Sequence, residues 1–152
     1  MTEAKEAGEL NEVLRSVIEV LHDGHEGMME IGKHLKDEST KQFFLRESQV
    51  RAEYAAELEN ELHRHGEHDV KEGGTAAGTI HRVWGELKSH LGGGDHTLLA
   101  TAEQGEDAAK AAYDKALKEK LPGDILDILR TQQAHILQSH NKVRDLRDAK
   151  AA

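Results

Sequence analysis

The sequence predicts an all-α protein built as a bundle of four long helices, and three observations lead to that prediction. Proline occurs once in the 152 residues, and Ala, Glu, Lys and Leu dominate the chain, a composition typical of helices. Apolar residues recur at helical spacing over four long stretches, and the alternation expected of strands is absent. Hydrophobic residues make up 37% and charged residues 32%, so the chain is too apolar to be disordered and too polar to be embedded in a membrane.

The first two helices are expected at about residues 10–36 and 40–65. Between them, Ser39 followed by Gln42 three residues later has the pattern of a capping box. Because so short a connection forces neighbours to run in opposite directions, these two helices are expected to form an antiparallel pair. Their apolar stripes consist of Leu14, Val17, Leu21, Met28 and Leu35 in the first helix, and Phe43, Val50, Tyr54 and Leu58 in the second.

The other two long helices are expected at about residues 95–120 and 125–148. Asp95 follows three glycines and is a favourable N-cap residue for the third helix. The sequence from Leu121 to Asp124, which contains Pro122, ends that helix and caps the fourth. This pair is therefore also expected to be antiparallel.

The connection at residues 66–95 determines the predicted topology. It is too long for a hairpin turn and includes a short amphipathic helix with Ile80, Val83, Trp84, Leu87 and Leu91. A helix of about 26 residues is roughly 40 Å long, and this connection can return the chain along that length. Helix three would then lie parallel to helix two, which is the one-crossover topology of ferritin-like folds. Residues 1–152 are interpreted as a single domain, with residues 1–9 as a frayed N-terminal tail.

Composition excludes several function classes. Cysteine is absent, so any metal must be held by His, Asp, Glu or main-chain oxygen, and no organic cofactor is indicated. The net charge of −9 and the aromatic content of 3% disfavour nucleic-acid binding. No apolar run approaches the ~20 residues that a spanning helix needs, and the acidic N-terminus is unlike a signal peptide. A cytoplasmic protein that does not bind membranes is expected.

Several polar residues fall on the predicted core faces. An ionised carboxylate in an apolar core costs several kcal/mol unless it is paired or bound to a cation. Carboxylates and imidazoles together suit iron, manganese or zinc. One interpretation is therefore a metal site in the middle of the bundle. Its predicted ligands are His25, Glu47, Glu106 and His140, with His22, Glu26, Glu103 and Gln133 as weaker candidates.

The alternative interpretation is a purely structural polar layer. Arg51 lies one helical turn from Glu47 and could neutralise it. A separate histidine cluster, His63, His65 and His68, lies near the end of the second helix, where a solvated helix end is favoured over metal binding.

Four sequence blocks stand out by their order and spacing: Ile18-Glu19-Val20-Leu21-His22-Asp23-Gly24-His25-Glu26-Gly27, His81-Arg82-Val83-Trp84-Gly85-Glu86-Leu87-Lys88, Glu103-Gln104-Gly105-Glu106-Asp107-Ala108-Ala109 and Ser139-His140-Asn141-Lys142-Val143-Arg144. Together they resemble an uncharacterised bacterial family of ferritin-like proteins, a domain of unknown function with stress-associated relatives. The resemblance implies a ferritin-like bundle and a link with stress responses. The di-iron members of the wider superfamily carry Glu-x-x-His on helix two, whereas in this chain the motif that starts at Glu47 has Val50 at its fourth place.

Two functional hypotheses follow. The first is a metal-binding ferritin-like protein with the site in the bundle core. The second is a non-enzymatic helical protein that acts by self-association, as a homo-oligomer, or by binding a partner helix. The sequence assigns no catalytic residue.

Overall fold

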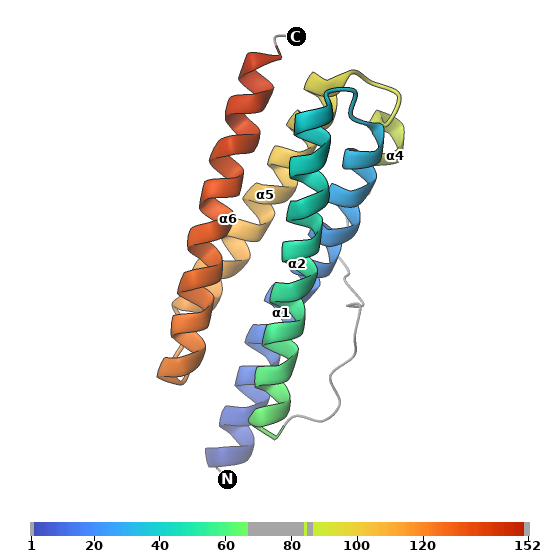
Figure 1. The fold of residues 1–152 in the computed structure, drawn as a ribbon. Coiled ribbons are helices and arrows are strands. Elements are labelled where there is room, and N and C mark those ends of the chain that lie inside the picture. The colour runs from blue at the N-terminus through green and yellow to red at the C-terminus, as the bar shows by residue number, and fades with distance from the viewer. Residues whose placement is uncertain (1, 67–83, 85–86, 151–152) are drawn as a thin grey trace.

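The computed structural model describes residues 2–66, 84 and 87–150, and these residues form four long helices and a short one (Figure 1). No strand occurs in these ranges, and the all-α four-helix prediction is confirmed. The helices are α1 (Thr2–His34), α2 (Glu38–Arg64), α4 (Leu87–His90), α5 (Asp95–Leu117) and α6 (Gly123–Ala149).

The two ends of the bundle show how the helices run. At one end, the backbone N–H groups of Lys36 and Asp37, in the α1–α2 turn, donate to the Asp95 carboxylate at 3.0 and 3.1 Å. At the other end, Arg64 at the end of α2 lies 3.6 Å from Asp124 in the first turn of α6. Helix α5 therefore begins where α2 begins and runs parallel to it, as the sequence predicted (Figure 1).

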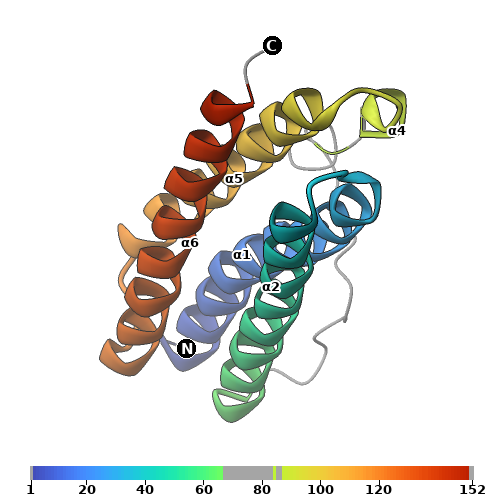
Figure 2. The same ribbon diagram turned by 45° about the horizontal axis from the view of Figure 1, so that its top comes forward.

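Much of the connection between α2 and α5 lies outside the described residues, including Ile80 and Val83 of the predicted short helix. Helix α4 contains Leu87 of that prediction, and Figure 2 shows α4 at the end of the bundle where α5 begins. None of the helices in the described ranges combines the length and the apolar character that a membrane span requires.

The N-cap of α2 differs from the prediction. Asp37 is the N-cap residue, and its carboxylate accepts the Thr40 backbone N–H at 2.9 Å and the Thr40 hydroxyl at 2.6 Å. The Ser39 hydroxyl also donates to Asp37, at 2.9 Å, and these hydrogen bonds lower the pKa of the Asp37 carboxyl group. The capping box of Ser39 and Gln42 is wrong because Gln42 instead donates to Glu38 at 3.0 Å.

The predicted N-cap of α5 is also wrong. Gly94 is the N-cap residue, and Asp95 is the first residue of the helix. The Asp95 carboxylate is engaged by the backbone N–H groups of the α1–α2 turn and so does not cap its own helix. Helix α6 likewise has Pro122 as its N-cap, so Asp124 lies inside the first turn.

Helix α1 begins at Thr2, where a frayed tail was expected at residues 1–9. Ala4, Lys5, Glu6 and Ala7 are all favourable helix formers, which explains why the helix extends past the start of the apolar stripe.

Two apolar clusters fill the bundle and flank a polar layer at mid-length. The cluster near the α1 N-terminus includes Leu14, Leu58, Tyr113 and Ile125. The cluster near the α1–α2 turn includes Met28, Phe44, Leu99 and Val143.

Trp84 packs against the bundle beside the second cluster. A Cβ atom placed on Gly27 of α1 or on Gly105 of α5 would overlap the Trp84 indole ring. The absence of side chains at these two positions therefore allows the indole to lie against both helices. Trp84, a member of the predicted short helix, therefore packs against α1 and α5.

Candidate functional site

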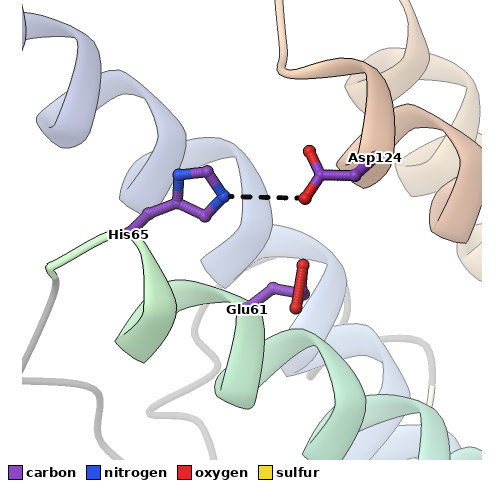
Figure 3. Close-up of side chains that lie close together, drawn as sticks. All are labelled: Glu61, His65 and Asp124. Atoms are coloured by element: carbon purple, nitrogen blue, oxygen red, sulfur yellow. Dashed lines mark ion pairs between the residues drawn. The ribbon is translucent and has the colours of Figure 1, made fainter.

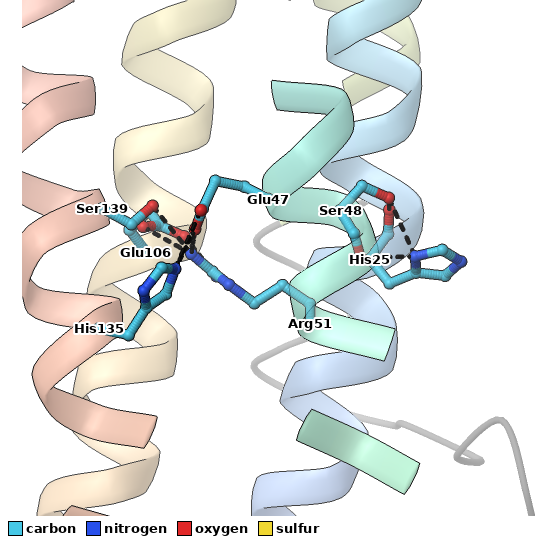
Figure 4. A network of polar contacts seen from close by, with 7 residues as sticks. All are labelled: His25, Glu47, Ser48, Arg51, Glu106, His135 and Ser139. Carbon is cyan, nitrogen blue, oxygen red and sulfur yellow. Dashed lines mark hydrogen bonds and ion pairs between the residues drawn. The ribbon is translucent and has the colours of Figure 1, made fainter. Parts of the chain in front are cut away.

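Arg51 lies at the centre of the polar layer, where its side chain is buried from solvent (Figure 4). Its guanidinium group donates to both carboxylate oxygens of Glu106, at 2.6 and 3.1 Å. It also donates to Glu47 at 3.3 Å and to the Ser139 hydroxyl at 2.9 Å. Arg51 thus joins α2 to both α5 and α6.

His135 of α6 supplies a second partner for Glu47. Its Nε2 atom lies 2.9 Å from each Glu47 carboxylate oxygen, and its ring contacts Tyr54 edge-on at a centroid distance of 5.8 Å. His135 and Ser139 were not among the residues predicted for the layer. Their spacing of four residues, which puts both on one face of α6, was the signal that could have found them.

The layer remains ionic despite its burial. Burial lowers the pKa of Arg51, but Glu106 and Glu47 outweigh that effect and raise it above the ordinary value. Arginine is in any case protonated throughout the accessible pH range. One buried guanidinium group therefore shares its charge between two carboxylates, and a buried ion set of this kind depends on every partner being present.

The two histidines predicted as core ligands lie away from these carboxylates. The His25 Nδ1–H donates to the Ser48 carbonyl oxygen at 2.8 Å, and the Ser48 hydroxyl donates to the His25 carbonyl oxygen at 2.7 Å. Figure 4 shows the His25 ring pointing away from the layer. The His140 Nε2 atom lies 2.8 Å from Asp107. The structure therefore brings Glu47 and Glu106 together around Arg51, without His25 or His140.

The weaker candidates also lie apart from one another. Glu26 is exposed. The other three have separate partners: His22 lies 3.5 Å from Glu59, Glu103 pairs with Arg147, and Gln133 donates to Asp114 at 2.6 Å.

A different group of ionisable side chains meets at the end of the bundle (Figure 3). Glu61 and His65 lie one turn apart at the end of α2, and Asp124 lies in the first turn of α6. One ligand atom from each residue lies within 4.8 Å of the other two. Across the described ranges, this is the group of three His, Asp or Glu side chains that meets this criterion. We call it the bundle-end cluster.

The members of the bundle-end cluster differ in exposure. Glu61 is buried, whereas the Asp124 side chain is 48% exposed. The His65 Nε2 atom lies 4.0 Å from Asp124, is shielded from solvent, and makes no hydrogen bond within the described part of the chain. An imidazole nitrogen without a hydrogen bond, close to two carboxylates, has the chemistry of a metal ligand.

Arg64 lies beside the bundle-end cluster. Its Nη1 atom lies 2.6 and 2.7 Å from the two Glu61 oxygens and 3.6 Å from Asp124. These hydrogen bonds to Glu61 raise the pKa of Arg64. The side chain is 64% exposed, so water can solvate the guanidinium group when it leaves the carboxylates.

His65 was predicted only as part of a histidine cluster, and Glu61 and Asp124 were not among the predicted site residues. The signal for the first pair was the four-residue spacing of Glu61 and His65. Asp124 could have been found from the predicted topology, because that topology places the start of the fourth helix beside the end of the second.

These features define a four-helix bundle with one crossover connection, a buried ionic layer and a carboxylate–histidine cluster at one end. The chain belongs to the family described as Domain of unknown function (DUF2383), whose model matches residues 9–119. The match includes Glu61 and His65 and ends before α6. No curated protein matches the chain. The predicted resemblance to a domain of unknown function is confirmed, whereas its ferritin-like, bacterial and stress-associated aspects stay predictions.

Proposed function

We propose that this protein binds a divalent transition-metal ion at the bundle-end cluster, through Glu61, His65 and Asp124. The observation that carries the proposal is the convergence of three potential ligand atoms from α2 and α6 within 4.8 Å. One imidazole and two carboxylates suit zinc, manganese or iron, which are also the metals that the sequence predicted.

The geometry requires only a small adjustment. Bonds from such metals to nitrogen and oxygen are about 2.0–2.2 Å long, so ligand atoms around one ion lie at most roughly 4.4 Å apart. Asp124 is exposed and can move toward the other two ligands. Three protein ligands leave at least one coordination position for water.

The mid-bundle layer is proposed to be structural. Arg51 already provides the positive charge that a metal would bring to Glu47 and Glu106. A second cation at this place would meet electrostatic repulsion from a guanidinium group that is fully enclosed.

Metal binding at the cluster would connect the α1–α2 hairpin to the α5–α6 hairpin. A ligand that binds only the folded state stabilises it by about 2.7 kcal/mol at a concentration of 100 Kd. A metal-dependent rise in the melting temperature is therefore expected along with binding itself.

The test is a calorimetric titration of chelator-treated protein, prepared without a His-tag, with zinc and with manganese. We expect one ion per chain and a loss of at least roughly tenfold in affinity for Asp124→Asn. Asp127→Asn is the matched control, because Asp127 is an exposed aspartate on the same helix and lies outside the cluster. Absence of binding by the wild-type protein, or equal affinity for Asp124→Asn, would contradict the proposal.

Self-association is the second candidate function. A groove between α1 and α5 is lined by Val13, Ala108, Ala112 and Leu121, and small apolar side chains allow close approach of another helix. Sedimentation velocity of the wild-type protein and of Ala111→Glu, at the exposed edge of this groove, would test it. A wild-type monomer at all concentrations would contradict a homo-oligomer.

A further inference from the structure

We infer that Arg64 lowers the affinity of the bundle-end cluster for divalent metal ions, because it competes with the ion for the oxygens of Glu61 and Asp124. This inference rests on the proposed function. The cost applies to every divalent ion, so a transition metal that also bonds to His65 binds in spite of it, whereas a cation that gains little from an imidazole ligand does not.

The geometry places Arg64 and a metal ion in direct competition. The Arg64 Nη1 atom contacts both oxygens of Glu61 at 2.6 and 2.7 Å, and these are the oxygens that would coordinate the ion. The same Nη1 atom lies 3.6 Å from Asp124. A divalent ion bound between Glu61 and Asp124 would therefore take the place of this guanidinium group or push it toward solvent.

The competing charge is present at every working pH. A guanidinium group is not deprotonated in proteins, and the hydrogen bonds with Glu61 raise the pKa of Arg64 further. Arg64 is also mostly exposed, so the competition is reversible. Arg51 contrasts with it, because Arg51 is enclosed and cannot be displaced without unfolding its surroundings.

The size of the competition follows from the strength of exposed ion pairs. Each exposed ion pair is equivalent to a factor of roughly 1.4 to 5 in a binding constant, and Arg64 contacts two carboxylates. Displacing it should therefore cost any divalent ion roughly two- to 25-fold in affinity. A bond to His65 offsets this cost for zinc. Magnesium prefers oxygen ligands and keeps its waters, so for magnesium the cost is not offset.

The experiment compares the wild-type protein with Arg64→Gln and with Arg130→Gln. Arg130 is the matched control, because it is 62% exposed and pairs with Asp127 at three residues' distance, as Arg64 pairs with Glu61. Each protein, without a His-tag, is titrated calorimetrically with zinc chloride and with magnesium chloride. We expect Arg64→Gln to bind zinc roughly two- to 25-fold more tightly and to gain affinity for magnesium by a similar factor. Arg130→Gln should match the wild type.

The outcomes separate this inference from the proposed function. Equal or weaker zinc binding by Arg64→Gln, with wild-type binding intact, would overturn the role of Arg64 and leave the metal site standing. A gain in affinity for only one of the two metals would overturn competition for shared carboxylate oxygens as the role of Arg64. Absence of zinc binding by all three proteins would overturn the metal site itself, and the inference with it.

Discussion

The mid-bundle layer and the bundle-end cluster are built from the same kinds of side chain, yet they differ in what they can do. Each contains two carboxylates, one histidine and one arginine. In the layer these are Glu47, Glu106, His135 and Arg51; in the cluster they are Glu61, Asp124, His65 and Arg64. The arginine side chain is 2% exposed in the layer and 64% exposed in the cluster.

This difference in burial decides whether the guanidinium group can leave its carboxylate partners. A buried guanidinium group that leaves its partners has no water to replace them and leaves two carboxylates uncompensated. An exposed group is solvated when it leaves, and exposed ion pairs contribute little to stability. Inward-facing carboxylates therefore do not by themselves indicate a metal site, because the chain can provide the cation from its own sequence.

The largest expected effect tests the structural role of the layer. Arg51→Leu leaves Glu47 and Glu106 buried without a cation and should lower the free energy of unfolding by about 3–5 kcal/mol. Arg64→Leu is the control at the exposed site and should change the free energy of unfolding far less, because exposed ion pairs contribute little to stability. Urea denaturation followed by circular dichroism measures both. Similar losses of unfolding free energy in the two variants would contradict the proposed difference between the layer and the cluster.

Replacement of the whole ion set sharpens this prediction. The triple variant Arg51→Met, Glu47→Leu, Glu106→Leu removes the charges together and should regain most of the stability that Arg51→Leu loses. If the triple variant is as unstable as Arg51→Leu, the loss of stability comes from poorer side-chain packing and not from uncompensated charge.

A smaller effect on thermal stability is expected from the packing of the Trp84 indole against Gly105. A methyl group at Gly105 would overlap the Trp84 indole, and overpacking costs about 1–3 kcal/mol. The higher helix propensity of alanine offsets about 1 kcal/mol of this, so Gly105→Ala should reduce the thermal midpoint modestly and leave zinc affinity unchanged. Gly123→Ala is the control, because no atom lies within 4 Å of the added Cβ position. A Gly105→Ala variant more stable than the wild type would contradict this packing.

The smallest expected effect is on stability at acidic pH, and it concerns Asp37, which lies at the end of the bundle opposite the bundle-end cluster. Asp37 has a folded-state pKa below its ordinary value because of hydrogen bonds from Thr40 and Ser39. Its contribution to stability is therefore present above the unfolded pKa and is lost as the pH falls below about 4. The difference in melting temperature between the wild type and Asp37→Asn should narrow as the pH falls from 7 to 3. A constant difference would contradict this role.

The architecture could be predicted from the sequence because four long apolar stripes and one long connection specify it. Glu47 and Glu106 were placed correctly inside the bundle, since each lies within an apolar stripe whose direction is fixed by helical periodicity. The possibility that Arg51 neutralises Glu47 is also confirmed by their hydrogen bond.

The contacts that could not be predicted depend on distances between side chains of different helices. A helical wheel does not show how far a long arginine side chain reaches, so the contact between Arg51 and Glu106 could not be read from it. The predicted topology places Asp124 beside the end of α2, but the distances within the cluster of Glu61, His65 and Asp124 depend on the register between α2 and α6, and α6 begins two residues before the predicted start. Single-helix patterns contain no information on that register.

The most direct test of where a metal binds compares Glu61→Gln with Glu47→Gln, the same substitution at the end and in the middle of the bundle. Zinc titration of both variants and of the wild type, all without a His-tag, measures the stoichiometry and the affinity. We predict that Glu61→Gln loses at least roughly tenfold in affinity, while Glu47→Gln is less stable and still binds one zinc ion as tightly as the wild type. Zinc binding that survives Glu61→Gln and disappears in Glu47→Gln would contradict the account and place the metal in the core.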